Sequence, residues 1–158
     1  MEGQLTVSES QLRRVLATLV VVMVVNQTGV VIISPLVVEI ASTFQVPVGL
    51  AGQLRTAGAL VSGLAAPWLG ALSDRAGRKP VILAGLAVVG ISALASALAP
   101  GFGWLLVIQA LSGLGIAALL STGLAAIGDY VPPERRAWAV GLVTTGQPLA
   151  WVIGLPLI

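Results

Sequence analysis

Four charged residues near the middle of the chain are the side chains best placed to do chemistry: Asp74, Arg75, Arg78 and Lys79, with Gly77 among them. Their chemistry is ion pairing and charge-assisted hydrogen bonding. The sequence has no histidine and no cysteine, so it lacks the commonest metal ligand, the usual general base and any thiol nucleophile. We therefore expect no enzyme active site, no metal site and no cofactor.

The composition indicates what surrounds these charges. The 158 residues are 57% hydrophobic and 9% charged, with a mean hydropathy of +1.03. A soluble domain carries roughly 25% charged residues, so this surface is expected to face a lipid bilayer rather than water. The net charge of +2 is too small for a nucleic-acid-binding protein, and no nucleic-acid partner is expected.

Long apolar segments account for most of the chain. Each has the length of about 20 residues that a helix needs to cross a ~30 Å hydrocarbon core, and none alternates with the period of a strand. The first is too long for the apolar region of a cleavable signal peptide. The sequence predicts an all-α, polytopic membrane protein with about five spans, at residues 15–38, 49–72, 80–99, 104–127 and 137–158.

The basic residues predict how these spans are oriented. Seven of the eight Lys and Arg residues fall before the first span, between the second and third, or between the fourth and fifth. All of these segments lie on one side of the membrane if the spans alternate, and basic residues favour the cytoplasmic side. We expect an integral protein of the plasma (cytoplasmic) membrane with a cytoplasmic N-terminus.

Small residues recur every fourth position on two of the predicted helices. Small residues let membrane helices approach closely, so we expect these two stripes to be packing faces. The alternative is chance recurrence in a sequence rich in alanine and glycine. The stripes are Gly58, Ser62, Ala66 and Gly70 on one helix, and Gly113, Ala117, Ser121 and Ala125 on the other.

The charged segment reads Gly70-x-Leu72-Ser73-Asp74-Arg75-x-Gly77-Arg78-Lys79. It resembles motif A of the major facilitator superfamily, which lies in the cytoplasmic loop between helices 2 and 3. The resemblance covers every hallmark position of the motif. It implies that the whole chain corresponds to the first five helices of a twelve-helix transporter.

The resemblance also implies a role for each residue of the motif. Asp74 is expected to face the N-terminus of a helix in the other half of the transporter, and Arg78 to hold Asp74 and an acid at the end of helix 4, here Asp129. Gly70 is expected to permit close helix contact and Gly77 a tight turn. Together the charges, Arg75 and Lys79 included, form a conformational latch. The alternative is that the basic residues are only topological anchors.

Three polar residues within the spans are candidates for the substrate cavity. Asn26 and Gln109 lie on helices 1 and 4, which line the central cavity in this superfamily; the alternative is hydrogen bonding between helices. Arg55 lies about two turns into the second span. It either extends to the outer membrane interface or faces the cavity, where it could bind an anionic group.

Helix 5 carries a partial second motif. Gly146, Pro148, Gly154 and Pro156 resemble the glycine- and proline-rich motif C of antiporters in the superfamily, which implies efflux. Gln109 stands where many proton-coupled drug exporters of the superfamily have an arginine, and no acid lies at the centre of a span. The resemblance therefore does not extend to proton coupling through this part of the protein.

These observations predict part of a secondary-active transporter that exports a small molecule by alternating access. The chain is expected to be a fragment whose partner is a missing C-terminal half, and to be unable to transport alone. Two alternatives stay open: a small multispan protein that acts as a homo-oligomer, and a non-functional truncated remnant.

Overall fold

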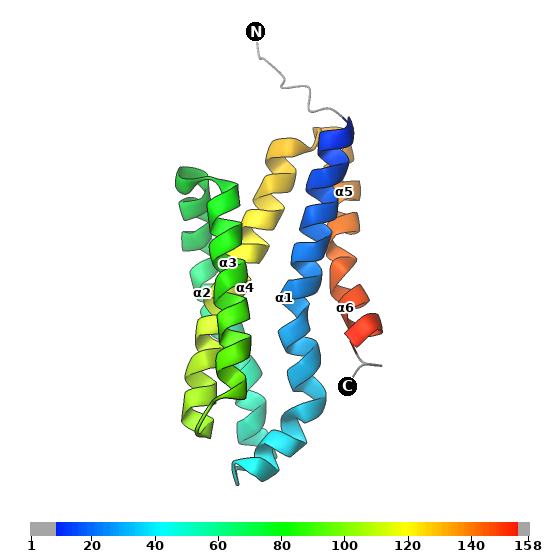
Figure 1. Cartoon of the computed structure of the whole chain (residues 1–158). Helices are drawn as coiled ribbons and strands as arrows, with labels where there is room; N and C mark the ends of the chain where they lie inside the picture. Colours follow the sequence, from blue (N-terminus) through cyan, green and yellow to red (C-terminus); the bar gives the residue numbers. More distant parts are fainter. Residues whose placement is uncertain (1–8, 155–158) are drawn as a thin grey trace.

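The computed structural model describes residues 9–154, and all regular structure in that range is helical (Figure 1). This confirms the all-α fold class. The chain order is α1 (Glu9–Thr43), α2 (Val48–Ala76), α3 (Arg78–Ala97), α4 (Phe102–Tyr130), the 3₁₀ turn η1 (Pro133–Arg135), α5 (Arg136–Thr144) and α6 (Gly146–Gly154).

The helices run alternately up and down along one axis. The start of α1, the turn between α2 and α3, and the connection from α4 to α5 all lie at the upper end of Figure 1. We call this the basic end, because these segments contain every lysine and arginine of the chain except Arg55. The connections from α1 to α2 and from α3 to α4 lie at the opposite end.

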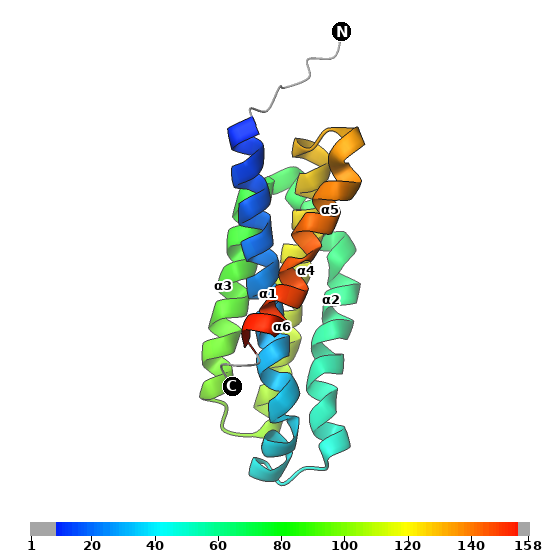
Figure 2. The same ribbon diagram turned by 90° about the vertical axis from the view of Figure 1, so that its right-hand side faces the viewer.

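Two groups of helices pack side by side. Helices α2, α3 and α4 form one group, and α1 packs with α5 and α6 in the other, as both Figure 1 and Figure 2 show. In the most apolar stretch of each helix, 39% of the residues of α4 are buried, against 11% for α2 and 17% for α3. Helix α4 is therefore the central element of its group, and α2 and α3 pack against it.

Glycines bring α4 into backbone contact with both neighbours. A Cβ at Gly113 would lie 2.4 Å from the carbonyl oxygen of Gly58 on α2, and one at Gly115 would lie 2.9 Å from that of Gly85 on α3. No side chain fits at such separations. The two predicted stripes thus face each other where they contain Gly58 and Gly113, which agrees with their expected role in packing.

A hydrophobic cluster joins the two groups at the basic end. Its members come from the first part of α1, the last part of α4 with the residue that follows it, and α5: Leu16, Leu19, Met23, Ala126, Ile127, Val131, Ala139 and Val143. All are buried. The cluster closes the basic end of the bundle between α1 and α4.

Within the predicted span 137–158, the described residues form two helices, α5 and α6, with an interruption at Thr145. Pro148 explains the interruption, because a proline lacks the N–H that would bond the carbonyl of Thr144 and its ring clashes with that carbonyl. Gly146 and Gly154 pack on α1, where added Cβ atoms would lie 2.7 Å from the Val20 carbonyl oxygen and 2.7 Å from Val31 Cγ1, respectively. Pro156 lies outside the described residues.

Three helices in the described part of the chain are long and apolar enough to cross a membrane: α2, α3 and α4. The outward face of α2 supports a lipid environment, since Leu60, Leu64 and Trp68 are 61%, 74% and 79% exposed. They recur every four residues and so form one apolar stripe. Pro35 lies inside α1, and the lower part of that helix bends toward α2 (Figure 1).

Candidate functional site

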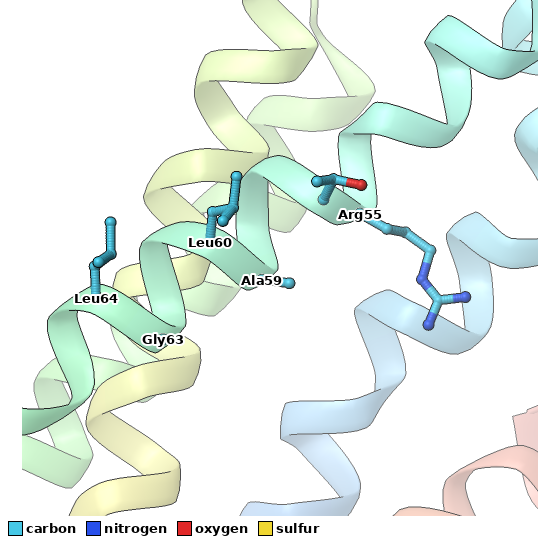
Figure 3. A pocket seen from close by; sticks show the side chains of 6 residues that line it. Arg55, Ala59, Leu60, Gly63 and Leu64 are labelled. Carbon is cyan, nitrogen blue, oxygen red and sulfur yellow. The ribbon is translucent and has the colours of Figure 1, made fainter.

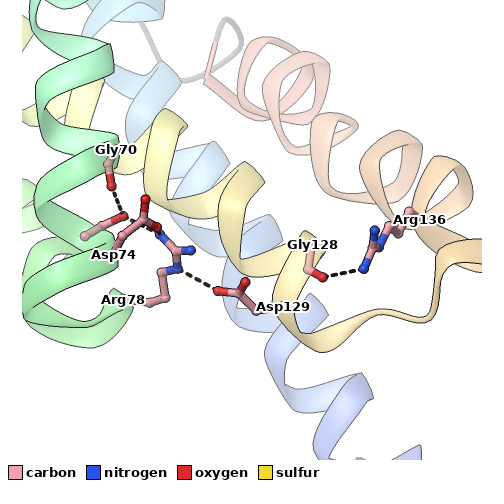
Figure 4. Close-up of polar contacts among 7 residues, drawn as sticks. Gly70, Asp74, Arg78, Gly128, Asp129 and Arg136 are labelled. Atoms are coloured by element: carbon pink, nitrogen blue, oxygen red, sulfur yellow. Dashed lines mark hydrogen bonds and ion pairs between the residues drawn. The ribbon is translucent and has the colours of Figure 1, made fainter. Parts of the chain in front are cut away.

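An arginine at the basic end connects the ends of three helices. Arg78, the first residue of α3, has Nη1 2.6 Å from Asp74 Oδ1 on α2 and Nε 2.7 Å from Asp129 Oδ2 on α4 (Figure 4). The arginine side chain is 18% exposed, whereas the carboxylates are 63% and 50% exposed. Arg78 is therefore the enclosed centre of the cluster, and the sequence prediction that it links these two acids agrees with the geometry.

Ser73 completes the cluster, and sequence reasoning gave it no role. Its hydroxyl donates to the Gly70 carbonyl at 2.8 Å and accepts from Arg78 Nη1. Ser73 is only 1% exposed, so it holds one side of the guanidinium in a fixed orientation. Ser73 is a position of the motif, so the sequence could have indicated it. A serine near a helix end commonly bonds a carbonyl three or four residues back, and its presence alone therefore does not indicate a contact with an arginine.

Gly77 forms the turn between α2 and α3, as predicted. Its N–H donates to the Ser73 carbonyl at 3.1 Å, and its φ of +93° with ψ of 155° lies in a region that essentially only glycine occupies. An added Cβ would lie 3.8 Å from Pro80 Cδ, so backbone strain rather than crowding requires glycine. This turn places Arg78 within reach of Asp74.

Each of the three charges lies at the unfavourable end of its own helix. Asp74 and Asp129 are in the last turns of α2 and α4, where the helix dipole is negative, and Arg78 is in the first turn of α3, where it is positive. Local helix energetics therefore disfavours all three. Their mutual contacts offset this cost only while the three helix ends stay together.

The other motif residues behave differently. Arg75 and Lys79 are exposed, and neither forms an ion pair within the described residues. An added Cβ at Gly70 would lie 3.8 Å from Ser121 Cβ, an ordinary contact, so the bundle itself leaves room for a methyl group there. The expected contact of Asp74 and Gly70 with another half of a transporter stays a prediction.

Arg136 is a second arginine with a structural role that the sequence did not reveal. Its Nη2 donates to the Gly128 carbonyl at 2.7 Å (Figure 4), and its Nε donates to the Val131 carbonyl at 3.1 Å. These carbonyls lie at the end of α4, where a cation is favourable. Arg136 therefore fixes the connection from α4 to α5.

A cavity of about 390 Å³ lies between α1, α2 and α4, with one contribution from α3. It occupies the middle of the bundle and the half nearer the opposite end, since its walls come from residues 26–33, 54–63 and 109–120. The three predicted cavity residues, Asn26, Arg55 and Gln109, all line it. Two serines also lie in its wall. The sequence placed Ser62 only in a packing stripe and did not single out Ser112.

Asn26 is the most deeply buried polar side chain of the cavity. It is 3% exposed, and its Oδ1 has no hydrogen-bond partner. An unpaired buried polar atom costs roughly 1–3 kcal/mol. The interhelical hydrogen bond that was the alternative role for Asn26 is therefore not made by this oxygen.

Arg55 extends from α2 toward α1 (Figure 3). Its Nη1 donates to the Ser34 hydroxyl at 3.1 Å, and Ser34 in turn donates to the Val30 carbonyl at 2.8 Å. Arg55, Ala59 and Gly63 also line a second hollow of about 550 Å³, whose remaining walls are side chains of α2 alone. Arg55 thus lines the cavity while its side chain stays exposed, and its expected extension to the outer membrane interface stays a prediction.

Comparisons with known proteins give the family. The major facilitator superfamily profile matches residues 19–158. The chain is 36% identical over 118 residues to the uncharacterized MFS-type transporter YfhI of Bacillus subtilis, covering 75% of this chain and 30% of that protein.

Two further relatives carry functional names. Citrate exporter 1 of Aspergillus niger is 32% identical over 76% of this chain and 23% of its own length. The niacin transporter NiaP of Acinetobacter baylyi is 29% identical over 65% of this chain and 23% of its own length. The chain thus spans less than a third of the length of these relatives. With the helical fold and the charged cluster of α2, α3 and α4, the profile match shows that the chain belongs to the major facilitator superfamily.

Proposed function

We propose that this chain is the amino-terminal part of a secondary-active transporter that exports a small molecule across the plasma membrane by alternating access. The carrying observation is that Arg78 joins α2, α3 and α4 at the basic end through Asp74 and Asp129. Each of these charges is unfavourable at its own helix end. The ion pairs therefore favour the conformation in which the three helix ends stay together, and a conformational change that separates the ends breaks these pairs.

The position of the cavity supports this mechanism. The hydrophobic cluster closes the basic end between α1, α4 and α5, while the cavity lies in the middle of the bundle and toward the opposite end. With the basic end in the cytoplasm, the intact latch accompanies a site that is closed to the cytoplasm. Alternating access then requires the latch to open when the site faces inward.

Export is supported by two observations. One relative is named an exporter, and another, of Candida glabrata, is named a multidrug transporter. The α6 residues that resemble the antiporter motif also make close contacts, since Gly146 and Gly154 pack directly on α1. Antiport through this motif is part of the proposal.

The fragment proposal is tested by reading the coding sequence after Ile158. We expect an open frame that adds a sixth helix and a second helical bundle, in line with the lengths of the relatives. A stop codon would contradict the fragment proposal and favour a homo-oligomer or a remnant without function.

Transport is tested on the product of that reading frame. Cells that express it are incubated with a mixture of small organic acids, bases and neutral solutes, and their contents are measured by mass spectrometry. We expect at least one solute to accumulate less than in cells that express Arg78→Gln. Equal accumulation of every solute with wild type and variant, at matched membrane levels, would reject the export proposal.

A further inference from the structure

We propose that the cavity between α1, α2 and α4 selects small organic anions, namely monocarboxylates with an apolar body and a hydrogen-bond donor. The inference rests on the proposed transport function and names its substrate class. Three features of the cavity support it: the charge of Arg55, the unpaired oxygen of Asn26, and the apolar wall between them.

Arg55 is the only charged residue among the described residues that line the cavity. Its one hydrogen bond within the described chain goes to the neutral Ser34 hydroxyl, so no carboxylate of the described chain neutralises it. A guanidinium has five donors in a planar fork that matches a carboxylate. A charge within a membrane span is costly, and a bound carboxylate would offset part of that cost.

The same charge argues against cationic substrates. A bound cation would meet the positive Arg55, and no acid among the described lining residues could attract it. Neutral solutes would leave the guanidinium without a counter-charge. Of the three charge classes, only anions gain from the cavity as it is built.

Asn26 adds a second requirement. Its Oδ1 is buried, lacks a partner and belongs to a side chain that lines the cavity. A ligand that donates a hydrogen bond to this oxygen, once the Asn26 side chain turns toward the cavity, would satisfy it, whereas a ligand without a donor would leave it unpaired. The expected substrate therefore carries a hydroxyl, an amide N–H or a similar donor in addition to its carboxylate.

The rest of the wall sets the size and polarity of the ligand. Most of the lining is apolar, including Val30, Ile33, Leu54, Ile116 and Leu120. A volume of about 390 Å³ lies near the lower limit of ligand pockets, which span about 300–1,000 Å³. A compact carboxylate with one ring or a short chain fits these walls better than a highly charged or bulky solute.

The charge requirement is tested by isothermal titration calorimetry of the purified chain in a neutral detergent, with benzoate, benzamide and benzylamine as probes. We expect benzoate to bind at least tenfold more tightly than the neutral and cationic probes. Arg55→Gln should remove this preference, and Arg55→Lys should retain part of it. Arg14→Gln, which removes an exposed arginine near the start of α1, is the matched control and should change nothing.

The donor requirement is tested with the three isomers of hydroxybenzoate and the corresponding methoxybenzoates. We expect at least one hydroxy isomer to bind several-fold more tightly than its methoxy counterpart. Asn26→Leu should abolish that difference while it leaves the preference for benzoate over benzamide. Circular dichroism and gel filtration establish that each variant is folded before titration.

The outcomes separate this inference from the proposed function. If benzamide binds as well as benzoate and Gly63→Phe, which fills the cavity, abolishes both, then the cavity is a binding site but the anion inference is wrong. If binding survives Gly63→Phe or depends on added anionic lipid, then Arg55 interacts with lipid headgroups rather than with a ligand in the cavity, and the inference is wrong. If no probe binds the folded chain, the inference is also wrong, and the export assay decides the proposed function independently.

Discussion

At the scale of single residues, Arg78 shows a conflict between local and global energetics. Two acids stand at helix C-termini and an arginine stands at a helix N-terminus, so each charge opposes its own helix dipole. Most sequences place charged residues at the helix end that favours them, and exceptions to such local preferences occur mainly at functional sites. The conflict makes this cluster the candidate functional site, which counting basic residues alone would not do.

Arg78→Gln should lower the stability of the chain by about 1 kcal/mol, the upper range for a partly exposed ion pair. The variant leaves Asp74 and Asp129 at unfavourable helix ends without a partner. Thermal unfolding in detergent, followed by circular dichroism, measures the change. Arg78→Lys should restore only part of the loss, because an ammonium cannot reproduce the planar fork that contacts Asp74, Asp129 and Ser73.

Arg75→Gln is the matched control for this prediction. Arg75 is exposed and forms no ion pair in the part of the chain that the structure describes. It should unfold like the wild type. Equal effects of the Arg75 and Arg78 variants would mean that only the total positive charge matters and that the specific geometry does not.

Gly77→Ala should destabilise the chain by about 1–3 kcal/mol, because alanine is strained at a φ of +93° and ψ of 155°. Gly90→Ala is the comparison, since Gly90 lies inside α3 with nothing within 4 Å of an added Cβ. That change should be neutral or stabilising, as alanine is the better helix former. A midpoint for Gly77→Ala equal to that of the wild type would contradict the strain argument.

Much of the site could be predicted from the sequence at this scale. The motif placed Asp74, Arg78 and Asp129 together, and the positions of Asn26, Arg55 and Gln109 within apolar segments predicted the cavity. Ser73, Ser34 and Arg136 were not predicted, because their bonds depend on how helix ends approach one another. The residue type of a serine or an arginine does not by itself identify its hydrogen-bond partner on another helix.

At the scale of elements, α2 and α4 run parallel and touch through their backbones. The contact is localised, since an added Cβ would clash at Gly113 but meet only an ordinary contact at Gly70. The spacing of small residues predicted two packing faces. It could not predict which of four positions would form the closest approach, because that depends on the crossing geometry of the whole helices.

Gly113→Ala should destabilise the bundle by about 1–3 kcal/mol, the typical cost of overpacking. Its methyl group would lie 2.4 Å from the Gly58 carbonyl oxygen and would push α2 away from α4. Gly128→Ala on the same helix is the control, because nothing lies within 4 Å of an added Cβ there. Equal thermal midpoints for the two variants would show that the contact is looser than described.

The interruption between α5 and α6 was not part of the sequence prediction. Pro148 was recognised as part of a motif, yet the segment was expected to be one continuous span. Prolines are tolerated in membrane helices, so their presence alone does not reveal a break. The tight contacts of Gly146 and Gly154 with α1 fix the segment on both sides of the break.

At the scale of the whole molecule, the alternation of the helices gathers seven basic residues at one end. The sequence predicted this arrangement because apolar length and charge placement depend only on local composition. The grouping of α1 with α5 and α6, and of α2 with α3 and α4, was not predicted. Helix pairing depends on shape complementarity between distant segments.

The predicted orientation is tested with cysteine variants, since the chain has no cysteine of its own. Ser42→Cys near the end of α1 and Glu134→Cys in η1 introduce single exposed thiols at the two ends of the bundle. In intact cells, a membrane-impermeant maleimide should label the thiol at position 42, and should label the one at position 134 only after permeabilisation. The reverse pattern would place the basic end outside the cell and contradict the proposed topology.

The open space at Gly63 has a consequence for how substrate range could evolve. Gly63 lines the cavity and has nothing within 4 Å of an added Cβ, whereas an added Cβ at Gly58, five residues away on the same helix, would lie 3.1 Å from the Gln109 carbonyl oxygen. Selection for new substrates can therefore reshape the cavity at Gly63 with little loss of stability. At Gly58 the same mutational step requires the backbones of α2 and α4 to shift by a few tenths of an ångström, so adaptive variants should be more frequent at Gly63 than at Gly58.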